Sequence, residues 1–258
     1  MKTNSVGLRG WLNHLILLCL IALPAKDGIA AALTETVKQV TPSVVAIALY
    51  SPLDSPQPDI RGTGFVVGDG KTIITNYHVV EKSLDPTIVQ HYVALSGTGQ
   101  RVQKFKAEVG NIDPKHDLAV LKIEQALPAM QLADTEFRQP GSEVAFTGFP
   151  IGAVLGLYPA THRGLLAAIT PDAIPTANSS QLSLKMLDRL EKPDMIYQLD
   201  ATAYPGNSGS PVYDPETGEV IAIISKVLVR DTKESALSSP TGISYGVPVK
   251  YLKALLER

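Results

Sequence analysis

A short glycine-rich segment in the second half of the chain carries a serine with the surroundings of a nucleophile. The segment reads Tyr204-Pro205-Gly206-Asn207-Ser208-Gly209-Ser210-Pro211-Val212. Glycines two places before and one place after Ser208 keep its hydroxyl clear of neighbouring Cβ atoms, and the amides of Gly206 and Ser208 can point to one spot. Such a pair could form an oxyanion hole, whose donors meet negative charge as a tetrahedral intermediate forms. A glycine-rich hairpin turn is the alternative interpretation.

Serine becomes a good nucleophile only when a neighbouring base takes its proton. His78 stands within Ile74-Thr75-Asn76-Tyr77-His78-Val79-Val80, at the end of an expected apolar strand that could aim its ring at a cleft. A buried core histidine is the alternative. His91, His116 and His162 lack such a setting, so we expect them on the surface or in loops, and no pair of histidines has the spacing of metal ligands.

A carboxylate on the far side of the base would present the correct ring nitrogen to the serine. Asp117 is the best candidate, because it opens the apolar run Leu118–Ile123 and a carboxylate at the head of a buried strand needs a partner. An ordinary strand-start residue is the alternative. Asp113 is close in sequence, but it precedes Pro114 in an expected turn, so we assign it to turn formation.

Most of the elements that must position these residues are predicted to be strands. Short apolar runs rich in β-branched residues are bounded by Gly, Pro, Asp and Asn, which is typical of strands. The runs are Val44–Tyr50, Gly64–Val67, Thr72–Thr75, Leu118–Ile123, Val144–Gly148, Leu165–Thr170 and Val220–Val229. Residues 129–142 have the composition of a connection between two similar halves. We therefore expect two small barrels with a cleft between them.

Helix signals are few. Leu33–Val40 and Gln181–Glu191 are candidate helices, and the apolar positions of the last ten residues fall on one face. The sequence has no internal repeat and no low-complexity stretch. The pattern therefore favours an all-β protein with a helix near each end.

The first 32 residues have the layout of a secretory signal peptide. Lys2 and Arg9 give a basic start, Leu15–Leu23 is almost wholly apolar, and small residues follow up to Ala32, near which we expect cleavage. The apolar run is about half of the ~20 residues of a membrane helix, so a permanent anchor is the less favoured alternative. Cys19, the one cysteine, lies in this run without the small residues of a lipid-attachment site. We expect an exported protein, periplasmic or secreted, without disulfides.

Composition excludes several other classes of protein. Hydrophobic residues make up 45% of the chain and charged residues 19%, which describes a packed core rather than disorder. A formal net charge of −2 gives no positive field for a phosphate backbone. Nucleic acid is therefore not an expected partner, and no membrane partner is expected after signal removal.

The order His78, Asp117, Ser208, with the wide separations that two successive barrels require, resembles the chymotrypsin-like serine proteases. Within them the chain is most similar to the exported bacterial HtrA/Deg-type proteases and to the V8-type glutamyl endopeptidases, over about residues 42–256. The motifs that fit the HtrA pattern are Gly62-Thr63-Gly64-Phe65, Thr75-Asn76 before His78, His116-Asp117-Leu118-Ala119-Val120, and Asp200-Ala201 ahead of Pro205-Gly206-Asn207-Ser208-Gly209.

The resemblance implies a chymotrypsin-like fold of two six-stranded antiparallel β-barrels, with a short N-terminal helix and a C-terminal helix. We expect a signal peptide at 1–32, a first barrel with His78 and Asp117 at 33–135, and a second barrel with Ser208 and the terminal helix at 136–258.

The resemblance also implies roles for single residues. His78 becomes the general base, Asp117 its orienting carboxylate and Ser208 the nucleophile, with Gly206 and Ser208 as the oxyanion donors. Ser225 matches the serine that supports the triad aspartate, and an ordinary polar strand residue is the alternative. Residues 161–168 resemble the loop and strand that shape the specificity and activation region of HtrA proteins.

Four departures from the family pattern carry information. Asn207 stands where digestive members have an aspartate that pairs with a freshly cut N-terminal amine, so we expect no activating cut beyond signal removal. Ser210 replaces the glycine usual in HtrA proteins, and Ser-Gly-Ser-Pro-Val is the V8-type motif. Tyr77 stands where a small residue is commoner and could reshape the cleft floor. No PDZ domain follows the terminal helix, so a peptide-sensing switch of that kind is not expected.

The sequence thus predicts an exported serine endopeptidase that acts on protein or peptide substrates through an acyl-enzyme and requires no metal or cofactor. Because His78 must be neutral to act as a base, activity should fall below about pH 6 to 7. A catalytically impaired binding module on the same barrels is the main alternative. An esterase is a second alternative, disfavoured because Ser210 and the His-Asp-Ser order do not fit the Gly-x-Ser-x-Gly hydrolases.

Substrate preference is left open by the sequence. The expected pocket wall includes Ala201, Thr202 and Ala203 before the nucleophile, and Lys226, Val227 and Val229 beyond it. Lys226 could attract an acidic side chain, although strand lysines are more often solvated. Small or medium apolar side chains are slightly favoured over acidic ones.

Overall fold

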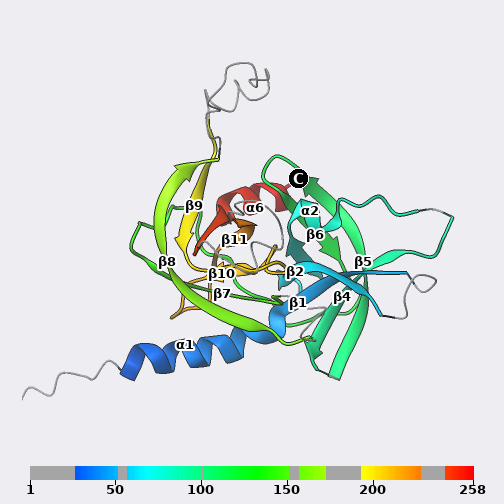
Figure 1. The fold of residues 1–258 in the computed structure, drawn as a ribbon, viewed down its shortest axis with the longest axis horizontal. Coiled ribbons are helices and arrows are strands. Elements are labelled where there is room, and N and C mark those ends of the chain that lie inside the picture. The colour runs from blue at the N-terminus through cyan, green and yellow to red at the C-terminus, as the bar shows by residue number, and fades with distance from the viewer. Residues whose placement is uncertain are drawn as a thin grey trace, which may run out of the picture.

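Two closed barrels of antiparallel strands make up the molecule (Figure 1). The computed structural model describes residues 27–51, 57–85, 87–99, 101–150, 157–172, 193–227 and 242–258. Outside these ranges lie the residues of the predicted signal peptide before Asp27, the candidate helix Gln181–Glu191 and the expected pocket residue Val229. The predicted fold, two six-stranded barrels with a helix near each end, is confirmed.

The first barrel closes in the strand order β1-β2-β3-β6-β5-β4. Its strands are β1 (Val44–Tyr50), β2 (Asp59–Val67), β3 (Thr72–Thr75), β4 (His91–Thr98), β5 (Arg101–Asp113) and β6 (Leu118–Lys122).

The second barrel closes in the order β10-β11-β12-β9-β8-β7. Its strands are β7 (Glu143–Gly148), β8 (Ala160–Pro171), β9 (Met195–Asp200), β10 (Pro211–Tyr213), β11 (Val220–Val227) and β12 (Ile243–Pro248). Between the barrels, Met130 bridges to Val67 of the first and Leu132 to Val220 of the second, so the connecting segment is bound to both.

Helices are short and lie outside the barrel walls. They are α1 (Asp27–Val40), the 3-10 turn η1 (Thr41–Ser43), α2 (Tyr77–Val80) and α6 (Val249–Leu256). Helix α1 begins at Asp27, six residues before the predicted start, and extends away from the barrels in Figure 1. No helix in the described ranges is long and apolar enough to cross a membrane.

The apolar core has three parts, and one of them joins the barrels. Each barrel interior has its own cluster of buried residues. A third cluster combines residues of both barrels, such as Phe65 of β2 and Tyr213 of β10, with Val249, Leu252 and Leu255 of α6. Helix α6 therefore packs against residues of both barrels at their junction.

Candidate functional site

The first candidate, His78, lies in the single helical turn α2 that follows strand β3. Two donors beside it, the Tyr77 amide and the Asn76 side-chain amide, both bond the carbonyl of Asp117, at 3.1 and 3.0 Å. These bonds tie the turn to the segment that precedes β6. The His78 side chain stays 41% exposed, so its ring can be reached from solvent.

Asp117 contacts the His78 ring at Nδ1. Its Oδ2 lies 2.8 Å from His78 Nδ1, and its Oδ1 accepts the His78 amide at 3.0 Å. A neutral His78 that donates from Nδ1 leaves Nε2 free as an acceptor. Burial opposes ionisation of Asp117, but the hydrogen bonds and charge of His78 and the bond from Ser225 hold the pKa of Asp117 below its ordinary value.

Ser225 reaches Asp117 from the second barrel. Its Oγ donates to Asp117 Oδ2 at 2.7 Å. In the ladder with β12, Ile224 pairs with Gly246 and Lys226 with Tyr245, so Ser225 is the extra residue of a β-bulge. A bulge redirects a side chain out of the regular alternation. The two barrels therefore meet at one carboxylate, through His78 on one side and Ser225 on the other.

The segment around Ser208 forms a tight loop between β9 and β10. Gly206 and Gly209 have φ angles of 99° and 86°, a region that favours glycine. Its bonds use the amides of Asn207, Gly209 and Ser210 and the carbonyls of Gly206 and Ser208. The backbone amides of Gly206 and Ser208, the two donors predicted for an oxyanion hole, take no part in these hydrogen bonds.

Strand β2 of the first barrel supports this loop through Thr63. The Thr63 amide donates to the Ser208 carbonyl at 2.8 Å, and its hydroxyl donates to the Gly206 carbonyl at 2.7 Å while accepting the Phe149 amide at 3.0 Å. Thr63 belongs to the motif Gly62-Thr63-Gly64-Phe65, from which no supporting role was predicted. Its function as a support could not be read from a threonine in an apolar strand.

Ser208 and His78 are brought to the same place by their neighbours. A Cβ on Gly62 would lie 2.7 Å from Val79, next to His78, and 2.9 Å from the Ser208 carbonyl. On the other side, Ile224, next to Ser225, exchanges backbone bonds with Gly209 and Ser210. The hydrogen bonds of the described residues include none between His78 and Ser208. Such bonds often form only when substrate is present.

Two buried polar side chains flank the loop without partners in the described part of the chain. Asn207 and Ser210 are 0% exposed, and neither the Asn207 amide nor the Ser210 hydroxyl makes a hydrogen bond there. A Cβ on Gly148 would meet Ser210 Oγ and Asn207 Oδ1, so only glycine fits beside them.

The expected pocket wall is partly described. Ala201 and Ala203 are buried, and the Ala201 carbonyl accepts the Ser244 hydroxyl at 2.9 Å. The backbone of Lys226 and Val227 belongs to β11. Two of the residues expected in the wall are therefore small and buried.

The expectation that the other histidines lie on the surface or in loops is confirmed for His116, a turn residue, and is wrong for His162. His162 lies in strand β8, stacked on Phe146 at 4.8 Å, and burial lowers its pKa. His116 lies in the β5–β6 turn, but its side chain is only 14% exposed. His91, the first residue of β4, packs edge-on against Tyr50.

The role of Asp113 in the turn is confirmed. Its Oδ1 accepts the amides of Lys115 and His116, at 3.1 and 3.3 Å. These bonds stabilise the turn that leads to Asp117.

Comparison with known proteins shows the family of the chain. The family described as "Trypsin-like peptidase domain" matches residues 62–223. A probable periplasmic serine endoprotease, DegP-like, of Chlamydia trachomatis is 29% identical over 200 residues, covering 77% of this chain and 33% of that protein. Human serine protease HTRA3 is 30% identical over 223 residues, covering 84% and 42%. The chain thus spans about a third of the length of the first of these relatives.

Solved structures share the fold. The HtrA-type protease AlgW with a decapeptide has a TM-score of 0.64 and 21% identity, covering 88% of this chain and 68% of that one. Deg5 has a TM-score of 0.62 and 22% identity, covering 89% and 94%.

Proposed function

The chain belongs to the trypsin-like peptidase family, and from that premise we propose that it is an exported serine endopeptidase with Ser208 as nucleophile. The observation that carries the proposal is the pair of bonds on Asp117 Oδ2, 2.8 Å from His78 Nδ1 and 2.7 Å from Ser225 Oγ. A carboxylate in this position selects the ring tautomer that a general base needs.

In this mechanism Ser208 Oγ attacks the carbonyl carbon of the scissile bond while His78 Nε2 takes its proton. The developing oxyanion accepts hydrogen bonds from the amides of Gly206 and Ser208. The protonated His78, stabilised by Asp117, then gives the proton to the leaving amine, which breaks the C–N bond and leaves an acyl-enzyme. Water, activated by His78, releases the acyl group.

The decisive experiment is labelling with a fluorophosphonate probe. We expect the wild-type protein to react and Ser208→Ala not to react. Ser96→Ala, a serine of β4 in the first barrel, is the matched control and should label like the wild type. Labelling that survives Ser208→Ala would place the nucleophile elsewhere. A folded wild-type protein that never labels would favour the impaired binding module.

The substrates of the proposed enzyme are proteins or peptides with small or medium apolar side chains before the cleaved bond. Buried Ala201 and Ala203 support this preference, and the bound decapeptide in the AlgW structure supports a peptide substrate. Profiling against a diverse peptide library tests it. Cleavage mainly after glutamate, lost in Lys226→Ala, would instead support the V8-type preference.

Export is supported by the N-terminal sequence pattern and by relatives named periplasmic. Cell fractionation with N-terminal sequencing should give a mature start near residue 33. A protein that keeps Met1 in the cytoplasm would contradict this part of the proposal.

A further inference from the structure

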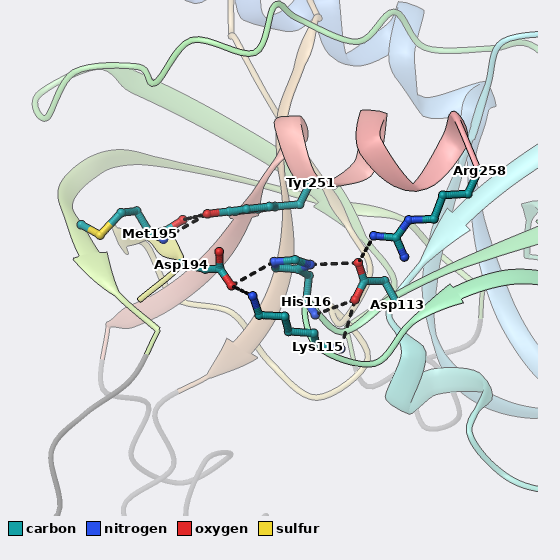
Figure 2. A network of polar contacts seen from close by, with 7 residues as sticks. All are labelled: Asp113, Lys115, His116, Asp194, Met195, Tyr251 and Arg258. Carbon is teal, nitrogen blue, oxygen red and sulfur yellow. Dashed lines mark hydrogen bonds and ion pairs between the residues drawn. The ribbon is translucent and has the colours of Figure 1, made fainter. Parts of the chain in front are cut away.

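A cluster of charged side chains surrounds His116, one residue before Asp117. Figure 2 shows its ring between two carboxylates and under the ring of Tyr251. Nδ1 lies 2.9 Å from Asp113 Oδ2, and Nε2 lies 3.1 Å from Asp194 Oδ2, an ion-pair contact whose angle is not that of a hydrogen bond. We call Asp113, Lys115, His116, Asp194, Tyr251 and Arg258 the His116 cluster.

The His116 cluster joins three parts of the fold. His116 comes from the β5–β6 turn of the first barrel, and Asp194 directly precedes β9 of the second barrel. Tyr251 comes from α6, and its ring stacks on His116 at 4.2 Å with an angle of 15° between the planes. The turn that ends at Asp117 is therefore docked on the second barrel and on the helix.

Charge makes this docking stronger than the stacking alone. Burial opposes ionisation of Asp113 and Asp194, but hydrogen bonds and nearby positive charge hold the pKa of both carboxyls below the ordinary aspartate value. Two ionised carboxylates thus face the two ring nitrogens. Lys115 lies 2.6 Å from Asp194, and Arg258 lies 3.4 Å from Asp113, so each carboxylate also has a cationic partner.

Asp117 needs this support because of its backbone. It is the one residue other than glycine with a positive φ among the described residues, at 55°. A side chain in this region is strained and persists only where its surroundings fix it. The peptide after Asp117 is fixed through its carbonyl, which accepts bonds from Asn76 and Tyr77. The peptide before Asp117 is carried by His116.

The His116 cluster and the Asp117–Ser225 contact also border one small cavity. It measures about 20 Å³, room for about one water molecule, and His116, Asp117 and Ser225 are among its lining residues. His116 and the Asp117–Ser225 pair therefore lie on the wall of the same cavity.

We propose that His116 is a positioning residue for Asp117: its contacts with Asp194 and Tyr251 fix the peptide that precedes Asp117 and so aim the carboxylate at His78. This inference rests on the proposed function, in which Asp117 orients the general base. His116 itself touches neither substrate nor reacting atoms.

The test compares three variants by kinetics on active sites counted with the fluorophosphonate probe. His116→Phe keeps a ring for stacking but removes both polar contacts, and Asp194→Asn weakens the contact from the second barrel. We expect kcat to fall about tenfold or more in His116→Phe and by less in Asp194→Asn, with KM nearly unchanged, since small displacements of catalytic groups act on kcat. Lys115→Met removes only the second partner of Asp194 and should stay close to wild type.

Two further readouts separate positioning from stability. The double variant His116→Phe/Asp194→Asn should be no slower than His116→Phe alone, because both changes act through one contact. In an NMR titration, which needs no substrate, the midpoint of the His78 ring should move to lower pH in His116→Phe as the carboxylate loses its aim.

Wild-type kcat per active site and an unmoved His78 titration, in variants with a lower melting temperature, would overturn the inference and leave the cluster a structural tie. If His116→Phe does not fold, the kcat of Asp194→Asn tests the inference. A reduced kcat supports it, and a wild-type kcat overturns it. The proposed function is tested separately, and it fails if the wild-type protein is not labelled at Ser208. The NMR titration of His78 can still be measured in that case, because it does not depend on activity.

Discussion

At the scale of single residues, the site depends on a few side chains whose partners come from distant parts of the sequence. Asp117 has three donors, two from His78 and one from Ser225, and it accepts them in a backbone conformation that costs energy. His78 and Ser225 therefore compensate for the strain at Asp117.

Activity and stability should respond to acid in different pH ranges. The pKa of Asp117 is lowered by folding, so the ionised carboxylate stabilises the fold above the ordinary aspartate value near 4, and this contribution is lost as the pH falls through the lowered value. A histidine can act as a general base only while it is neutral, so we expect activity to be lost at a higher pH than stability. At pH 5 we expect a folded but weakly active protein, measured by circular dichroism and by peptide hydrolysis. Full activity at pH 4 would contradict the assignment of His78.

The candidate residues could be proposed from the sequence because their types are rare in apolar runs. His78 and Asp117 interrupt such runs, and Ser208 lies among glycines, so each was visible without the fold. Thr63 and His116 were not found, because their importance lies in contacts to residues about 80 to 145 positions away. No local pattern contains that information.

At the scale of elements, the predicted apolar runs overlap seven of the twelve strands in the described part of the chain, and β4, β5, β9, β10 and β12 were missed. Strands β1 and β3 have the predicted bounds, since almost all their residues are buried. Strand β5 was not predicted because most of its side chains are exposed, including Lys104, Lys106 and Glu108. Strand β10 has only three residues, too few for a periodic signal. Their pairing comes from barrel closure rather than from local propensity.

The hydrogen bonds between Thr63 of β2 and the loop that carries Ser208 can be tested by substituting Thr63. Thr63→Val keeps the shape but leaves the Gly206 carbonyl and the Phe149 amide without their partner. We expect a loss of about 1–3 kcal/mol in the free energy of unfolding and a fall in kcat of roughly tenfold as the oxyanion donors lose alignment. Thr63→Ser keeps the hydroxyl and should behave like wild type in urea unfolding and peptide hydrolysis. Equal kcat for the two variants would remove Thr63 from the site.

At the scale of the whole molecule, the site exists only where two barrels meet. The shared apolar cluster under α6 and the bonds from Ser225 and Thr63 both cross this junction. Packing of the junction and geometry of the site are therefore coupled.

Substitutions in helix α6 test how much packing at the junction of the barrels stabilises the protein. Leu252 is 0% exposed and packs in the cluster shared by both barrels. Leu252→Ala should lower the free energy of unfolding by about 2–5 kcal/mol. Leu256→Ala, at a position 38% exposed, is the matched control with a smaller loss. Thermal unfolding followed by near- and far-UV circular dichroism checks both, and a Leu252→Ala protein as stable as wild type would show that α6 is not part of the core.

The N-terminus should be free of any activating role. Asn207 is buried without a charge that could pair with an N-terminal amine. A protein with extra residues before Leu33 is therefore expected to hydrolyse peptides as fast as the mature form, with its intact mass unchanged after the assay. Activity that appears only after the tail is cut would contradict this expectation.

The bulge in β11 shows how function can oppose the regularity of a sheet. Ser225 faces Asp117 because it is one residue too many for the ladder with β12. Deleting that residue would make the pairing continuous from Ile224 to Lys226, but it would remove the hydroxyl that donates to Asp117. A regular β11 is therefore expected to raise the melting temperature of the protein while the Asp117 carboxylate loses its contact with the second barrel.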